Sequence, residues 1–284
     1  MQKFPELFEF RLDKMIDRFV DWLTVAGEPI FDAIGAGLLM PLLMLQRFLL
    51  WLPWFVIIGA IALAAWKLSG WKLALGSVIG LLFIGILGLW EMAMSTLAIV
   101  LAATLLAILV GVPVGIMMAR NDLIEQIIRP LLDLMQTMPS FVYLIPALML
   151  FGLGKVPALL STFIYAVPPA IRLTNLGIRQ VAPDVIECGR AFGSTSRQLL
   201  FKVQLPLAMP TIMAGVNQTI MMALAMVVIA SMIGAGGLGK EVLTGIAQLK
   251  VGKGFTGGIS IVILAIIMDR LTQALTQSQT KHLT

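Results

Sequence analysis

The chain has 284 residues, of which 59% are apolar and only 12% are charged, whereas a soluble domain carries roughly 25% charged residues. Together with a mean hydropathy of +0.98, this composition excludes a soluble domain and predicts an all-α polytopic membrane protein. The formal net charge is +5, but the basic residues stand mostly in short connections between apolar blocks, which indicates membrane topology and not nucleic-acid binding.

The chain has one histidine and one cysteine, which limits the metal-binding, acid–base and disulfide chemistry that it can support. The single histidine, His282, lies near the C-terminus, so we expect no histidine-based metal site or general base within the membrane. The single cysteine, Cys188, excludes an intramolecular disulfide. The sequence also lacks a motif for a nucleophile or for paired carboxylates, and we therefore expect neither catalytic residues nor a bound metal.

Residues 1–47 are predicted to form an N-terminal amphipathic or interfacial segment. Within residues 5–25, apolar side chains recur on one helical face and acidic ones on another, which is typical of a helix that lies along a membrane or a partner. The residues up to Arg18 mix charges of both signs, so we expect no cleavable signal peptide. Residues 33–46 carry no charge but are short of the ~20 residues that a span needs. We interpret them as interfacial or re-entrant, with a full span as the alternative.

About seven membrane spans are predicted after this segment, because charge-free intervals close to the necessary ~20 residues recur. The intervals are residues 48–66, 73–90, 92–119, 134–154, 156–171, 203–239 and 254–268. Prolines interrupt 134–154 and 156–171, and we expect broken helices there, since such breaks are tolerated where helices line a cavity. The chain accordingly divides into peripheral helices at 48–90, a transmembrane core at 91–275 and a tail at 276–284.

The distribution of basic residues predicts which side of the membrane each connection occupies. In a seven-span chain most of these residues fall on one side, which their excess marks as cytoplasmic: Lys67, Lys72, Arg120, Arg129, Arg172, Arg179, Arg190, Arg197, Lys202, Arg270 and Lys281. Four lysines fall on the other side, namely Lys155, Lys240, Lys250 and Lys253. The termini would then lie on opposite sides, and the polar segment 183–206 would be cytoplasmic.

The segment 183–206 has mixed polar character between two apolar blocks, and its pattern predicts a hairpin of two short helices. Pro183 suits a helix start, Gly193 suits a break, and Ser194 or Thr195 can cap the second helix. From the pattern alone, the hairpin is either a solvated loop or a contact surface for a partner outside the membrane.

A glycine-rich run at 234–239 matches G-x-G-x-x-G, but it follows an apolar block and not a strand of a βαβ unit, so we interpret it as a bend. Other side chains in the apolar blocks are candidates for lining a pathway: Met138, Pro139, Tyr143, Tyr165, Asn217 and Met221. Tyrosine rings attract cationic solutes by about 0.5–2 kcal/mol each, and methionines suit helices that slide. Core packing is the alternative for the tyrosines and methionines, and a buried helix contact is the alternative for Asn217.

The hairpin resembles the EAA signature of ABC importer permeases, E-A-A-x-x-x-G followed after nine residues by I-x-L-P. Glu187, Gly193 and the pair Leu205-Pro206 match it, whereas Cys188 and Gly189 stand in the alanine positions and Val203 in the isoleucine position. Further segments resemble the permease subunits of glycine betaine and proline betaine importers: DRFVDWLT (17–24), DLMQTMPSFVYLIPA (133–147), AFGSTSRQLLFKVQLPLA (191–208), VVIASMIGAGGLG (227–239) and AIIMDRLTQ (265–273).

This resemblance implies a type I ABC importer transmembrane fold in the bacterial cytoplasmic membrane. It implies a homodimeric permease, two ATP-binding subunits beneath it that hold ATP and Mg, and an extracytoplasmic substrate-binding protein, with no cofactor in this chain. The hairpin becomes a coupling helix, and the residues assigned to that contact are Glu187, Cys188, Gly189, Arg190, Ala191, Phe192, Gly193, Ser194, Leu205 and Pro206.

The substrate expected from the resemblance is glycine betaine or a related osmoprotectant. Carnitine or choline with the same machinery is the first alternative. An osmotically gated channel is the second, and it gives no reason for the spacing of the signature. An intramembrane hydrolase is a third, and the sequence has neither H-E-x-x-H nor G-x-S-x-G.

Overall fold

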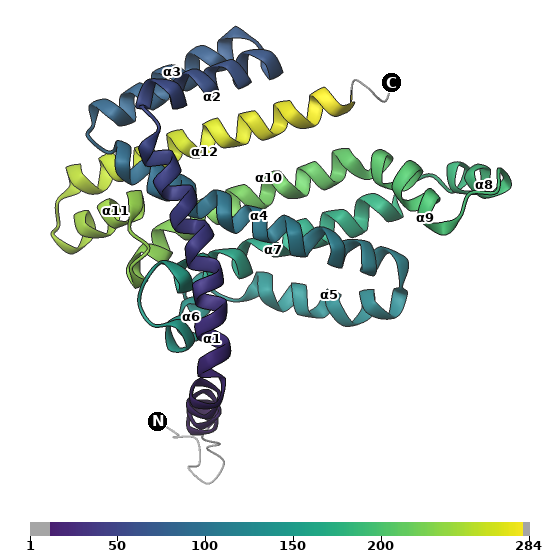
Figure 1. Ribbon diagram of the computed structural model, residues 1–284, viewed down its shortest axis with the longest axis horizontal. Coiled ribbons are helices and arrows are strands. Elements are labelled where there is room, and N and C mark those ends of the chain that lie inside the picture. The colour runs from purple at the N-terminus through teal and green to yellow at the C-terminus, as the bar shows by residue number, and fades with distance from the viewer. Residues whose placement is uncertain (1–11, 281–284) are drawn as a thin grey trace, which may run out of the picture.

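A computed structural model describes residues 12–280, and every regular element within that range is helical. Four long helices form the body of the molecule: α4 (Trp90–Arg120), α7 (Lys155–Arg179), α10 (Leu205–Ala230) and α12 (Val251–Thr280). Their axes are roughly aligned (Figure 1), with α10 antiparallel to α7, and α7 packs against both α4 and α10. The hairpin of interest projects from one end of this body, and α11 (Gly237–Ala247) lies at the other end.

Small residues allow α7 to lie very close to both of its neighbours. A Cβ at Gly115 of α4 would stand 2.7 Å from the carbonyl oxygen of Ile171, and one at Gly215 of α10 would stand 3.1 Å from the carbonyl oxygen of Pro169. Backbone contacts of this kind are the usual basis of helix association in membranes, where burial of apolar surface gives little advantage. The three helices α4, α7 and α10 therefore form one tightly packed unit.

Prolines break one of the two predicted helices and not the other. After α5 (Asp122–Thr137) the chain turns at Met138 and Pro139, continues through the 3₁₀ turn η2 (Ser140–Tyr143) into α6 (Leu144–Phe151), and is bent by 111°. The predicted break in 156–171 is wrong, because α7 continues through Pro168 and Pro169. Both prolines are buried between α4 and α10, and packing on two sides outweighs the hydrogen bonds that the prolines remove.

The N-terminal region is one helix and not two segments. Helix α1 (Leu12–Trp51) joins the predicted amphipathic stretch to residues 33–46 and runs past the boundary at residue 47. It lies across the long helices instead of alongside them (Figure 1). It packs against the body through Leu42 and neighbouring leucines. Its side-chain hydrogen bonds to the body lie near helix starts: Gln46 donates to Ser95 Oγ near the start of α4, and Lys155 at the start of α7 donates to Gln46 Oε1.

Two short apolar helices lie at the edge of the body. Helices α2 (Trp54–Ser69) and α3 (Trp71–Ile86) form an antiparallel pair that packs against α12. Each has 16 residues, so at 1.5 Å per residue each is about 24 Å long, somewhat less than the ~30 Å hydrocarbon core.

The expected number of spans is not established by helix length. Among the described residues, five helices are long and apolar enough to cross a membrane, or six if the bent α5–α6 pair counts as one. A count of spans by length and composition alone includes α1 and leaves out the shorter helices α2 and α3. The number of about seven stays a prediction.

The glycine-rich run is a bend, as predicted. The chain leaves α10 through the 3₁₀ turn η4 (Ser231–Ile233), and Gly234, Gly236 and Gly237 have positive φ angles. The backbone N–H of Leu238 donates to the buried Thr96 hydroxyl of α4 at 2.8 Å, and a Cβ at Gly237 would stand 2.4 Å from that hydroxyl oxygen. These glycines therefore let the bend and the start of α11 lie directly on α4.

Candidate functional site

The projecting hairpin consists of α8 (Pro183–Ala191), a turn at Gly193, α9 (Ser196–Leu199) and the π-helical turn η3 (Leu200–Gln204). The end of α8 has the hydrogen bonds of a Schellman motif. The N–H of Gly193 donates to the Arg190 carbonyl at 2.9 Å, and the N–H of Ser194 donates to the Gly189 carbonyl at 3.1 Å. Gly193 has φ +77°, a conformation that favours glycine. The predicted break at Gly193 is confirmed.

The second helix begins with a capping box. The Thr195 hydroxyl accepts a hydrogen bond from the Gln198 N–H at 3.3 Å, and the Gln198 side chain accepts one from the Thr195 N–H at 2.9 Å. Of the two caps that the sequence allowed, the chain therefore uses Thr195. Gly189 in the first helix lets the arms approach, since a Cβ there would stand 2.8 Å from Leu199 Cδ1. The hairpin is thus held in one shape by its own backbone and caps.

The outer surface of the hairpin combines charge with an exposed aromatic ring. None of the side chains of α8 is buried, and Phe192 at the tip is 86% exposed. A shallow hollow lies beside it, lined by Asp184, Val185, Cys188, Gly189, Phe192 and Val203. A large apolar ring held out on a rigid turn next to charged residues is typical of a surface that meets another protein.

The other arm of the hairpin is anchored in the body. Leu200 is buried together with Ile178 at the end of α7 and with Ala208 and Ile212 of α10. Helix α9 passes through η3 directly into α10, with Pro206 in the first turn of α10. Leu205 and Pro206, two of the predicted contact residues, therefore lie at this junction and not at the tip. This arm therefore joins the tip to α10 through the chain itself and to α7 through the packing of Leu200 on Ile178.

A polar cluster ties α4, α5 and α7 together beside the hairpin, and sequence reasoning did not identify it. Arg179 near the end of α7 forms ion pairs with Asp122 at 2.6 Å and with Glu125 at 2.9 Å, and it donates to the Met118 carbonyl at 2.9 Å. Asn175 donates to Glu125 at 3.0 Å. The available signal was a basic residue at the end of one span and acids in the first turn of another, a pairing that helix dipoles also favour.

The six predicted pathway residues fall into two groups. Tyr143 and Tyr165 stack edge to face with ring centroids 5.7 Å apart, and Met138 packs against the same cluster beside the Met138-Pro139 turn. The Tyr143 hydroxyl donates to the Met135 carbonyl. In this conformation the two tyrosines are packed against each other, as the packing alternative expected.

The second group lies on α10. Asn217 donates to Asp269 of α12 at 2.8 Å, and Gln273 donates to both Asp269 oxygens, also at 2.8 Å. Asn217 therefore makes the helix contact that its position in an apolar block allowed. Met221 is 41% exposed on the same helix. Among the described residues, no group of three or more His, Cys, Asp or Glu is arranged to hold a metal ion.

A body of apolar helices with a bent helix pair, and a polar hairpin that continues into a core helix, describe a multi-pass membrane protein with an exposed polar projection. Residues 111–281 match the family described as "Binding-protein-dependent transport system inner membrane component". The chain belongs to this family and is an inner-membrane component with several apolar helices.

Named relatives cover most of the chain. It is 54% identical over 263 residues to the glycine betaine/proline betaine transport system permease protein ProW of Escherichia coli (strain K12), covering 93% of this chain and 74% of that protein. It is 50% identical over 262 residues to the glycine betaine transport system permease protein OpuAB of Bacillus subtilis (strain 168), and the match covers 92% of this chain and 93% of that protein.

The fold is similar to that of a solved importer. A chain of the MetNI methionine ABC transporter in an inward-facing conformation superposes with a TM-score of 0.60 at 20% identity, covering 65% of this chain and 93% of that one. The expected type I ABC importer transmembrane fold and the resemblance to betaine permeases are therefore confirmed.

Proposed function

We propose that this chain is the permease subunit of an ATP-driven importer of glycine betaine or a related quaternary-amine osmoprotectant. The observation that carries the proposal is the hairpin 183–206, a preformed contact surface continuous with a core helix, in a chain about half identical to two glycine betaine permeases. The chain itself performs no covalent chemistry, and ATP and Mg are bound by a partner ATPase subunit.

The hairpin is the coupling helix that fits into a groove of that ATPase. Phe192 fills the groove, Glu187, Cys188 and Arg190 lie on the exposed side of α8, and Gly193 fixes the turn that presents them. When the ATPase subunits close around ATP, the tip moves and the anchored arm moves α10 and α7. The membrane subunit then alternates between two states whose balance is set by nucleotide.

The complete importer contains a second copy of this chain, two ATP-binding subunits and an extracytoplasmic substrate-binding protein. The pathway lies beside Met138, Pro139, Tyr143 and Tyr165, where the bent α5–α6 pair faces α7. Separation of the two stacked tyrosines would expose ring faces that attract a quaternary ammonium. Asn217 and Met221 border the pathway from α10.

The choice among quaternary amines rests on relatives at different distances. A glycine betaine/carnitine permease of Listeria monocytogenes (strain 10403S) is 52% identical, whereas a carnitine permease of Listeria monocytogenes and a choline permease of Bacillus subtilis are 35% and 36% identical. Glycine betaine is therefore preferred, with carnitine as the second candidate.

Reconstitution tests the function directly. Proteoliposomes that contain this chain, an ATPase subunit and a binding protein of the glycine betaine class should accumulate labelled glycine betaine only when ATP is present inside. Phe192→Asp should lower this uptake at least tenfold, because a charge replaces the apolar tip, while Phe192→Leu should retain most of it. Flux without ATP would instead support a channel, and wild-type uptake by Phe192→Asp would overturn the role of the hairpin.

A further inference from the structure

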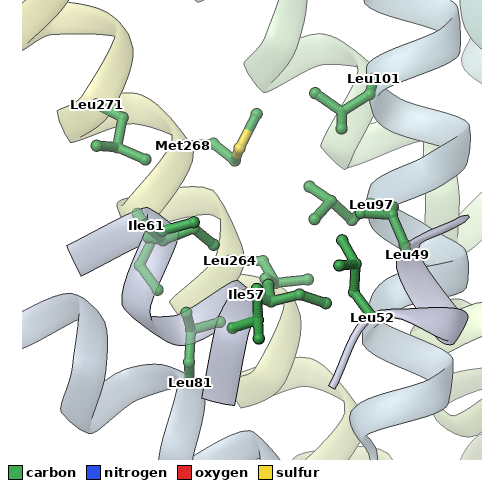
Figure 2. A pocket seen from close by; sticks show the side chains of 13 residues that line it. Leu49, Leu52, Ile57, Ile61, Leu81, Leu97, Leu101, Leu264, Met268 and Leu271 are labelled. Atoms are coloured by element: carbon green, nitrogen blue, oxygen red, sulfur yellow. The ribbon is translucent and has the colours of Figure 1, made fainter. Parts of the chain in front are cut away.

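An apolar groove lies where the peripheral pair α2–α3 meets the body. Helix α2 packs on α12, and a hollow of about 280 Å³ remains between α2, α4 and α12. Figure 2 shows Leu97 of α4, Ile57 and Ile61 of α2, and Met268 of α12 around the open space, each from a different side. All 13 lining side chains are apolar.

The groove suits hydrocarbon and not water. A buried water needs two to four polar partners, and an apolar cavity of roughly 150 Å³ stays dry and accepts benzene. The lining side chains offer no such partners. Large apolar side chains on the outer faces of the same three helices are exposed, including Leu63 of α2, Leu105 of α4 and Val262 of α12. In an inner-membrane protein these faces contact lipid, so the groove opens to acyl chains.

One end of the groove carries the features that meet a lipid headgroup. Ala60 lines the hollow, and Lys67 lies seven residues further along α2 on nearly the same helical face, about 10 Å away along the axis. Lys67 is exposed, and the neighbouring Trp66 is 63% exposed. Tryptophan and lysine side chains together mark the depth of the headgroups.

We propose that this groove binds one acyl chain of an anionic phospholipid whose phosphate contacts Lys67. The acyl chain occupies the hollow between α2, α4 and α12 and fills the space that the contact of α2 with α12 leaves open. The charge complementarity at Lys67 favours an anionic headgroup over a zwitterionic one.

The test uses the purified full-length chain in lipid nanodiscs that contain phosphatidylglycerol with a photoreactive diazirine in one acyl chain. After irradiation, mass spectrometry locates the label. Wild-type protein should carry label on residues 57–61 and 264–271. Ala60→Phe fills the hollow and should lower this labelling at least fivefold, whereas the lipid-facing segment around Leu105 should be labelled as before, which shows that the variant is folded.

Two matched variants control for bulk and for charge. Gly59→Phe adds a larger group at the adjacent exposed position, where a Cβ meets no atom within 4 Å, and should retain groove labelling within twofold. Phosphatidylcholine with the same diazirine serves as the zwitterionic comparison. Lys67→Gln should lower labelling by the phosphatidylglycerol probe at least threefold and leave labelling by the phosphatidylcholine probe unchanged. Lys72→Gln, a similarly exposed change in α3, should alter neither.

Three results would overturn the proposal. Undiminished groove labelling in Ala60→Phe would mean that the hollow is not the binding site. Equal labelling by the two lipids in wild-type protein would remove the role of Lys67. Absence of label from the wild-type groove, with the Leu105 segment labelled, would mean that another part of the protein, such as a second copy, fills it.

Discussion

At the scale of single residues, the hairpin depends on backbone conformation more than on side-chain contacts. Gly193 has φ +77°, and a Cβ placed there would meet no atom within 4 Å. Any effect of substituting it must therefore come from the left-handed backbone conformation and from what the hairpin touches outside this chain. The sequence predicted this position because glycine after a short polar helix is a common stop signal.

The effect of replacing Gly193 should depend on how well the new residue tolerates the left-handed backbone conformation. Gly193→Val should strain the turn by about 1–3 kcal/mol and lower ATP-dependent glycine betaine uptake several-fold, with normal amounts of protein in the membrane. Gly193→Asn should be milder, because asparagine tolerates the left-handed region. Uptake assays with immunoblots of membrane fractions would measure both. If the valine and asparagine variants impair uptake equally, glycine is required at position 193 because of contact with the partner and not because of backbone strain.

At the scale of elements, sequence reasoning predicted local signals well and tertiary effects poorly. It predicted the two arms of the hairpin, the break at Pro139 and the glycine-rich bend, each of which depends on residues close in sequence. It predicted a break at Pro168 and Pro169 that does not occur, since α7 is continuous there and packs against helices from distant parts of the chain. It also missed the cluster around Arg179, whose partners Met118, Asp122 and Glu125 are more than fifty residues away in sequence.

The close packing of α4 on α7 should be sensitive to a single methyl group. Gly115→Ala would place its Cβ 2.6 Å from Thr174 Cβ and 2.7 Å from the Ile171 carbonyl oxygen, so we expect a destabilisation of about 1–3 kcal/mol. Gly76→Ala in α3, where a Cβ meets no atom within 4 Å, should be neutral or stabilising by up to about 1 kcal/mol. Thermal unfolding of the purified proteins in detergent would compare them. Equal melting temperatures for Gly115→Ala and Gly76→Ala would contradict the close packing of α4 on α7.

At the scale of the whole molecule, α1 crosses the half of the body that lies away from the polar hairpin (Figure 1). The sequence predicted residues 33–46 to be interfacial or re-entrant, with a full span as the alternative, and helix length alone would let α1 cross the membrane. Both alternatives stay predictions. The continuity of α1 could not be predicted, because the charged and apolar stretches resemble separate elements.

The single exposed cysteine makes this arrangement measurable. Cys188 lies in the hairpin, so a membrane-impermeant maleimide should label it in inside-out vesicles and not in intact cells. Addition of the ATPase subunit should slow that labelling at least fivefold. In a Cys188→Ser background, Glu28→Cys on the exposed face of α1 should show the opposite sidedness. Labelling of Cys188 from outside would contradict the topology.

The Gln46 amide has a consequence for how fast the molecule changes state. It joins α1 to Ser95 of α4 and to Lys155 of α7 at the same end of the body. A transition that separates these two helix ends must either break one of the bonds or carry α1 sideways. Helix α1 exposes bulky side chains such as Phe19 and Trp22. Where these side chains lie in lipid, we expect the viscosity of the bilayer to enter the rate of that movement.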